Sequence, residues 1–151
     1  MSGERHLQIE LLLWLPLTVG FYFLTTSFTY ALIFGGTYLA SSLLLSPDLD
    51  LKENRARRRW GFLHFIWWPY VKVFKHRGMS HSLLFGPITR LGYLAFLVAL
   101  VLFVLKISLP QLSLNMSAPV LVTLISGLYA PNVLHVLLDR VYSGVKRRVR
   151  W

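Results

Sequence analysis

The chain has 151 residues, of which 55% are hydrophobic, and it carries a formal net charge of +10. A soluble domain of this length could bury a core, but soluble domains are rarely this apolar. There is no cysteine, which excludes disulfides, thiolate-bound zinc and iron–sulfur clusters and leaves nitrogen and oxygen ligands for any metal ion. The positive charge favours an anionic partner, such as phospholipid head groups, nucleic acid or a phosphorylated substrate.

Four hydrophobic runs come close to the length of a membrane-spanning helix, which needs about 20 apolar residues. They cover approximately residues 9–24, 28–45, 83–107 and 118–138. Proline interrupts the first run at Pro16 and the last at Pro131. We therefore expect an all-α integral membrane bundle of about four transmembrane helices, formed by residues 1–151 as a single domain.

The basic residues mark one end of these runs. The connection 46–80 and the tail 140–151 hold most of them, whereas the connections 25–27 and 108–117 hold none. Because positively charged loops stay in the cytoplasm, we expect an inner or plasma membrane protein with both termini cytoplasmic. The same rule accounts for most of the net charge, so we expect no nucleic-acid partner.

An aromatic segment, WGFLHFIWWPYVKVF, occupies residues 60–74 of the long connection. It is too short to span a bilayer, and the basic run 55–59 before it would lie against anionic lipid. Several of its rings suit the head-group layer, where one edge is wet and the other dry: Trp60, Trp67, Trp68 and Tyr70. We expect the segment to lie at the inner leaflet, either as an anchor alone or with a further role.

All acidic residues and histidines lie at or near the cytoplasmic end of a run. Ionisable groups beside hydrocarbon are costly, so this gathering indicates a functional site. The motif SPDLD places Asp48 and Asp50 after the second run, where they could converge on a cation or form a turn and cap. The motif KHRGMSHS places His76 and His81 around Gly78, before the third run, as site residues or as interfacial histidines.

The motif HVLLD places His135 and Asp139 four residues apart, on one face of the last helix, which Asn132 shares. The pair could form a simple hydrogen bond, or it could bind a cation that compensates the carboxylate. Arg90 stands inside the third run. We interpret it as snorkelling to the interface, with a phosphate clamp facing the bundle interior as the alternative.

The helix ends together deliver these side chains to one plane. Mixed histidine and aspartate ligation suits Zn, Mn or Fe, and neighbouring metal ions can polarise a phosphoester. The predicted metal ligands are Asp48, Asp50, His81, His135 and Asp139, with His6 as a further candidate. The predicted catalytic residues are His76, as a general acid or base, and Arg77, as a phosphate-binding arginine.

The motifs SPDLD, RWGFLHFIWWPY, KHRGMSHS and HVLLD, in this order, resemble a bacterial family of metal-binding membrane proteins of unknown function. That family is similar in turn to LexA-regulated, membrane-bound metal-dependent hydrolases. The resemblance covers nearly the whole chain and implies a small multi-span protein with a His/Asp metal site and hydrolase activity. The family's Thr-His-Asp is replaced here by Arg5, His6 and Leu7, so a carboxylate is missing and Glu4 or Glu10 would have to substitute. Leu138 also replaces a residue that is commonly small and polar.

We therefore expect a metal-dependent hydrolase that acts on a phosphoester or lipid-like substrate at the cytoplasmic leaflet. The alternative is a non-catalytic, metal-stabilised scaffold that binds anionic membrane lipid or a protein partner. A transporter fits less well, because the centres of the runs hold few polar side chains beyond Thr18, Thr37 and Thr123.

Overall fold

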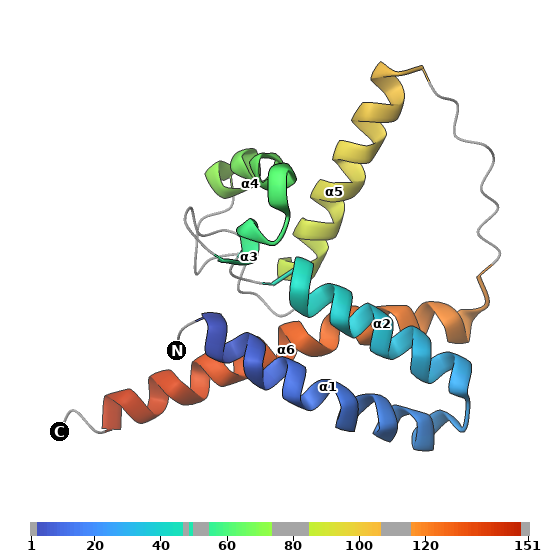
Figure 1. Ribbon diagram of the computed structural model, residues 1–151, viewed down its shortest axis with the longest axis vertical. Coiled ribbons are helices and arrows are strands. Elements are labelled where there is room, and N and C mark those ends of the chain that lie inside the picture. Colours follow the sequence, from blue (N-terminus) through green and yellow to red (C-terminus); the bar gives the residue numbers. More distant parts are fainter. Residues whose placement is uncertain (1–2, 47–48, 50–54, 74–84, 107–115, 149–151) are drawn as a thin grey trace.

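The computed structural model describes residues 3–46, 49, 55–73, 85–106 and 116–148 (Figure 1). Every regular element among these residues is a helix, which confirms the expected all-α fold. In chain order the elements are α1 (Gly3–Thr25), α2 (Phe28–Leu44), α3 (Arg55–Arg58), the 3₁₀ helix η2 (Gly61–Ile66), α4 (Trp67–Val73), α5 (Phe85–Val104) and α6 (Ala118–Arg148).

The helices present an apolar outer surface. Residues 4–25, 85–104 and 118–144 form three helices that are long and apolar enough to cross a membrane, and α2 is a shorter apolar helix of 17 residues. Large hydrophobic side chains point outward from them, such as Leu12, which is 74% exposed, and Phe103, which is 82% exposed. Such a surface is stable in hydrocarbon and costly in water. The fold is therefore that of a membrane bundle, whose orientation stays a prediction.

Helix α2 packs against both α1 and α6, and these three helices form the centre of the bundle (Figure 1). A Cβ atom at Gly127 would lie 1.9 Å from Thr37 Oγ1 and 2.7 Å from the carbonyl oxygen of Phe34, so the α6 backbone touches α2. On the other side of α2, the carbonyl oxygen of Gly35 accepts a hydrogen bond of 3.0 Å from the indole of Trp14. Small residues at helix crossings allow this close approach in a membrane.

The C-terminal end of α2 is capped by side chains from outside the helix. Its last carbonyl groups, at residues 43–45, have no partner within a regular helix. Arg59 donates to the first at 3.3 Å, Trp60 donates to the second at 3.0 Å, and Arg90 of α5 donates to the third. Two of these donors are cations, which are favourable at the negative end of a helix dipole.

An aromatic cluster joins the segment 60–73 to α5. Trp67 and Tyr70 are fully buried, and their ring centroids lie 5.7 Å and 5.4 Å from that of Tyr93 in α5. The sequence predicts that the rings of this segment lie in the head-group layer, but these two pack inward because α5 supplies them with a partner. Trp68 is 56% exposed and remains available to an interface.

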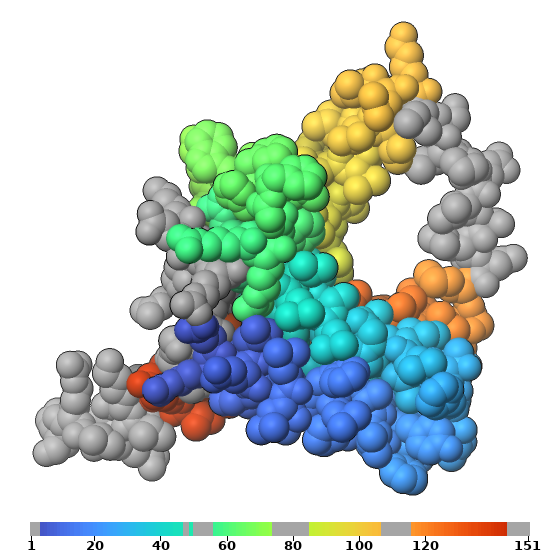
Figure 2. Space-filling model, in the orientation of Figure 1, coloured from blue at the N-terminus to red at the C-terminus, as the bar shows by residue number. Residues whose placement is uncertain are grey.

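Helix α5 stands away from α1 and α2 over most of its length (Figures 1 and 2). Its buried residues are Gly86, Pro87 and Arg90, all near its start. The beginning of α5 is therefore anchored in the bundle, and the remainder presents an apolar surface to its surroundings.

Candidate metal centre

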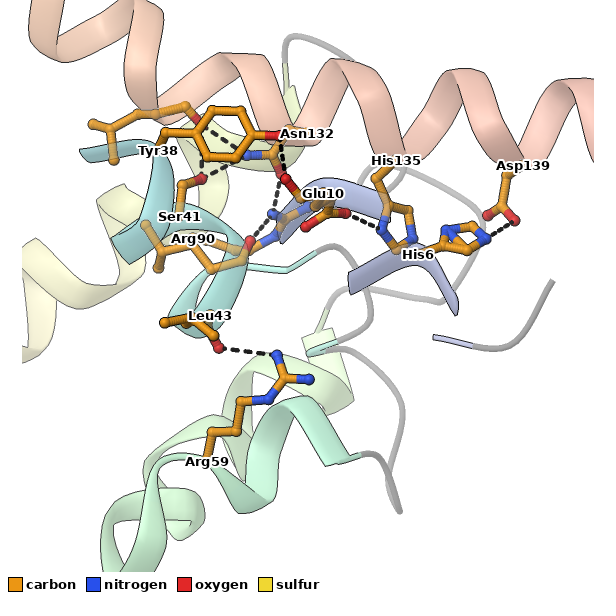
Figure 3. A network of polar contacts seen from close by, with 12 residues as sticks. His6, Glu10, Tyr38, Ser41, Leu43, Arg59, Arg90, Asn132, His135 and Asp139 are labelled. Atoms are coloured by element: carbon orange, nitrogen blue, oxygen red, sulfur yellow. Dashed lines mark hydrogen bonds and ion pairs between the residues drawn. The ribbon is translucent and has the colours of Figure 1, made fainter. Parts of the chain in front are cut away.

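Two histidines and an aspartate meet where the beginning of α1 lies against α6 (Figure 3). The rings of His6 and His135 have their centroids 4.1 Å apart, at an interplanar angle of 57°. His6 Nε2 lies 3.1 Å from Asp139 Oδ1. The two histidines are 2% and 1% exposed, whereas the aspartate side chain is 34% exposed. The cluster is thus buried on one side and accessible on the other.

The arrangement follows from two pairs of residues with the same spacing. His135 and Asp139 lie four positions apart on α6, and His6 and Glu10 lie four positions apart on α1, so each pair shares a helical face. His6 contacts Asp139, and Glu10 contacts His135. The order is reversed between the helices, as antiparallel packing requires. Each helix therefore contributes one imidazole and one carboxylate to the same cluster.

Glu10 orients His135. The Nδ1 atom of His135 lies 3.0 Å from Glu10 Oε1, and both side chains are buried. With a carboxylate as acceptor, the ring proton belongs on Nδ1, which leaves the Nε2 lone pair as the ligand atom. Glu10 is itself held in place, because the Tyr38 hydroxyl of α2 donates a hydrogen bond of 3.0 Å to its backbone carbonyl oxygen.

The residues present fit a divalent metal ion. His6, His135 and Asp139 each offer a ligand atom, and these atoms all lie within 4.8 Å of one another. Ligand atoms around a tetrahedral ion, each about 2.1 Å from it, are about 3.4 Å apart. The contact of 3.1 Å between His6 and Asp139 is close to that spacing. Two imidazoles and one carboxylate suit Zn, Mn or Fe and do not select among them.

A buried arginine of α5, Arg90, contacts α6 at Asn132, about one helical turn before His135. Arg90 is 1% exposed, and its Nη1 donates to Asn132 Oδ1 at 2.7 Å and to the carbonyl oxygen of Leu45. Asn132 Nδ2 donates to Ser41 Oγ at 3.0 Å and to the carbonyl oxygen of Leu128 at 2.9 Å. The interpretation that Arg90 snorkels is therefore wrong. The end of α2 and the asparagine amide supply acceptors inside the bundle that offset the cost of burying the cation.

The structure brings together part of the predicted site. The predicted ligands His6, His135 and Asp139 are adjacent, and their binding of a metal ion stays a prediction. The other predicted residues lie outside the part of the chain that the structure describes, and their roles stay predictions: the ligands Asp48, Asp50 and His81 and the catalytic residues His76 and Arg77.

Glu10 was expected only as an alternative to Glu4 for the missing carboxylate. The structure places Glu10 against His135, whereas Glu4 is exposed and lines a separate pocket. The signal in the sequence is the spacing of four residues from His6, which repeats the spacing of His135 and Asp139. That repeat identifies Glu10 only when the two helices are known to pack antiparallel.

Comparison with known proteins agrees with a metal site. Residues 1–149 match the family model described as "Uncharacterized metal-binding protein (DUF2227)". An uncharacterized protein of Aquifex aeolicus (strain VF5) is 42% identical over 65 residues, and the match covers 43% of this chain and 46% of that protein. No solved structure matches the chain. Since the family model covers nearly the full sequence, the chain belongs to this family of uncharacterized metal-binding proteins.

Proposed function

We propose that the protein is a metal-dependent hydrolase acting on a phosphoester or lipid-like substrate at the cytoplasmic leaflet. The observation that carries the proposal is the convergence of His6, His135 and Asp139, with the buried carboxylate of Glu10 behind one imidazole. Ionisable groups buried in a membrane protein are costly and mark functional sites. Membership of a metal-binding family supports the proposal that a metal ion binds here. The hydrolytic reaction is inferred from the chemistry of the proposed ligands.

The uneven burial of the three ligands supports a catalytic site. The imidazoles of His6 and His135 are fixed inside the bundle, and the 34% exposure of the Asp139 side chain leaves one side accessible to substrate. Catalytic metal sites keep one coordination position open, whereas structural sites are closed by protein ligands, and an exposed ligand leaves room for such a position. His6, His135 and Asp139 would hold the divalent ion, which would supply Lewis-acid polarisation of a phosphoryl oxygen. Glu10 keeps the His135 ring in one tautomer and orientation.

The wider proposal includes residues outside the described ranges. Asp48, Asp50 and His81 would complete the ligand set, His76 would act as general acid or base, and Arg77 would bind the phosphate. The choice of Zn, Mn or Fe and the relation to LexA-regulated membrane-bound hydrolases belong to the same proposal.

One observation favours a second function. The ligands come from α1 and α6, the first and last helices of the chain, so a bound ion would tie these helices together. That arrangement suits a non-catalytic, metal-stabilised scaffold that binds anionic lipid or a protein partner.

Elemental analysis of the purified protein in detergent tests the metal assignment. We expect the wild type to hold a divalent transition metal and the His135→Ala and Asp139→Asn variants to lose it. His64→Ala is the matched control, because His64 is exposed on η2 and its ring contacts the carbonyl oxygen of Gly61 at 2.9 Å. Unchanged metal content in both site variants would show that the assignment is wrong.

A screen of phosphodiester and phospholipid substrates then separates the two functions. Turnover that disappears on chelation and in Asp139→Asn, but persists in His64→Ala, supports the hydrolase. Stoichiometric metal without turnover, together with a lower melting temperature after chelation, supports the scaffold.

A further inference from the structure

A pocket on another face of α1 contains two adjacent arginines. Glu4, Leu7 and Gln8 of α1 and Arg58 and Arg59 from the end of α3 line a volume of about 400 Å³. Glu4 and Gln8 each stand two positions from the ligand His6, which at about 3.6 residues per turn places them on the far side of the helix. The pocket is therefore separate from the metal centre.

The two arginines give this pocket the chemistry of a phosphate site. Arg59 is held at the pocket wall by its hydrogen bond of 3.3 Å to the carbonyl oxygen of Leu43, and Arg58 beside it is exposed. Guanidinium groups bind phosphate oxygens in a bidentate way. Glu4 lies in the same pocket and reduces its formal charge to a single positive unit. This balance favours a phosphodiester, with one negative charge, over a phosphomonoester with about 1.5 to 2.

An apolar path leads from this pocket along α1. Leu7, Leu11, Leu15, Thr18 and Tyr22 are spaced by three or four residues and share one face of the helix. Leu11 and Leu15 are 38% and 59% exposed. From Leu7 to Leu15 the helix rises about 12 Å, close to half the thickness of a hydrocarbon core of about 30 Å.

The path ends in an apolar groove between α1 and α2. The groove has a volume of about 560 Å³, and its lining includes Leu15, Thr18 and Tyr22 of α1 together with Leu32 of α2. Figure 2 shows α1 and α2 side by side along this part of the molecule. The basic pocket at the beginning of α1 suits the phosphate head group of a membrane lipid. The apolar groove, about one leaflet further along the helix, suits the end of its acyl chain.

We propose that α1 carries a docking site for one anionic glycerophospholipid. Its phosphodiester lies between Arg58 and Arg59, and one acyl chain follows Leu7, Leu11 and Leu15 to the groove. The site depends on the membrane placement of the helices and not on the hydrolase or the metal ion, so either proposal can fail alone.

Native mass spectrometry of the detergent-purified protein, equilibrated with defined lipids, tests this site. We expect wild-type protein to retain one phosphatidylglycerol in preference to phosphatidylcholine and phosphatidic acid, and to retain no glycerophosphoglycerol, the same phosphodiester without the acyl chains. Arg58→Gln should weaken phosphatidylglycerol binding about fivefold, and the double variant R58Q/R59Q about 30-fold. Arg58 is exposed, so the single variant remains informative if the double variant does not fold.

Three further variants distinguish a specific lipid site from general electrostatic attraction between the protein and anionic lipid. Lys72→Gln removes an exposed cation, stacked 3.6 Å over the Trp68 ring and outside the pocket, and should leave binding unchanged. Leu32→Trp fills the groove and should weaken binding, whereas Leu100→Trp on the exposed face of α5 should not. Equal losses in Lys72→Gln and Arg58→Gln, or equal binding of all lipids, would overturn the proposal.

Discussion

Replacement of Glu10 by alanine removes the carboxylate that accepts the hydrogen bond of 3.0 Å from His135 Nδ1. Loss of such a partner behind a metal-bound histidine lowers metal affinity by about 10- to 100-fold, or about 1.4 to 2.7 kcal/mol. The lower metal affinity should not be accompanied by a loss of the fold. The Tyr38 hydroxyl bonds to the backbone oxygen of Glu10, so this contact between α1 and α2 survives any change of the side chain.

The assay is a metal dissociation constant, measured by competition with a chromophoric chelator on detergent-purified protein. Glu10→Gln should lie between wild type and Glu10→Ala, because its amide oxygen still accepts the hydrogen bond but carries no charge. Glu4→Ala, on an exposed position of the same helix, should bind metal as wild type does. If Glu10→Ala unfolds at the wild-type temperature and keeps the wild-type dissociation constant, Glu10 does not position a metal ligand and the reasoning fails.

Further predictions concern unfolding in detergent. Gly127→Ala should destabilise the protein by about 1–3 kcal/mol, because the added methyl group overpacks α6 on α2. Gly36→Ala, with nothing within 4 Å of its Cβ, should not destabilise it. Equal stabilities of the two variants would contradict the close crossing of α2 and α6. Arg90→Met should cost about 1–3 kcal/mol for each buried acceptor left without its donor, and a neutral result would show that its hydrogen bonds are unimportant. Trp67→Ala should cost about 3–5 kcal/mol and the exposed Trp68→Ala less than about 1 kcal/mol; the reverse order would refute the aromatic cluster. Adding a chelator to metal-saturated protein should lower the melting temperature of wild type and leave that of His135→Ala unchanged.

Local patterns predicted the helices and one half of the metal cluster. Apolar runs were sufficient to predict an all-α chain, since they depend on neighbouring residues. The two prolines that interrupt these runs, Pro16 and Pro131, lie inside α1 and α6. The spacing of His135 and Asp139 predicted a shared face because a helix repeats every 3.6 residues or so. The proximity of His135 and Asp139 to His6 was expected because the predicted topology places the ends of the first and last helices on the same side of the membrane.

The remaining features depend on packing between distant elements. Arg90 is buried because Asn132 and the Leu45 carbonyl group supply acceptors, and neither is adjacent to it in sequence. Trp67 resembles an interfacial residue until Tyr93 of α5 covers it. A single sequence records the side chains in such contacts but not the helix crossing that creates them.

The pairing of α1 with α6 implies that metal binding at the proposed site would be a late step in the assembly of the protein. Glu10 and His135 are separated by 125 positions, so α1 is synthesised before its partner α6. Until α6 arrives, an imidazole and a carboxylate of α1 lack the groups that compensate them. His6, His135 and Asp139 come together only after α6 has packed against α1 in the correct register. If the proposed ion binds at this cluster, metal content would report that α1 and α6 have assembled, and we expect a protein shortened before α6 to lack the ion.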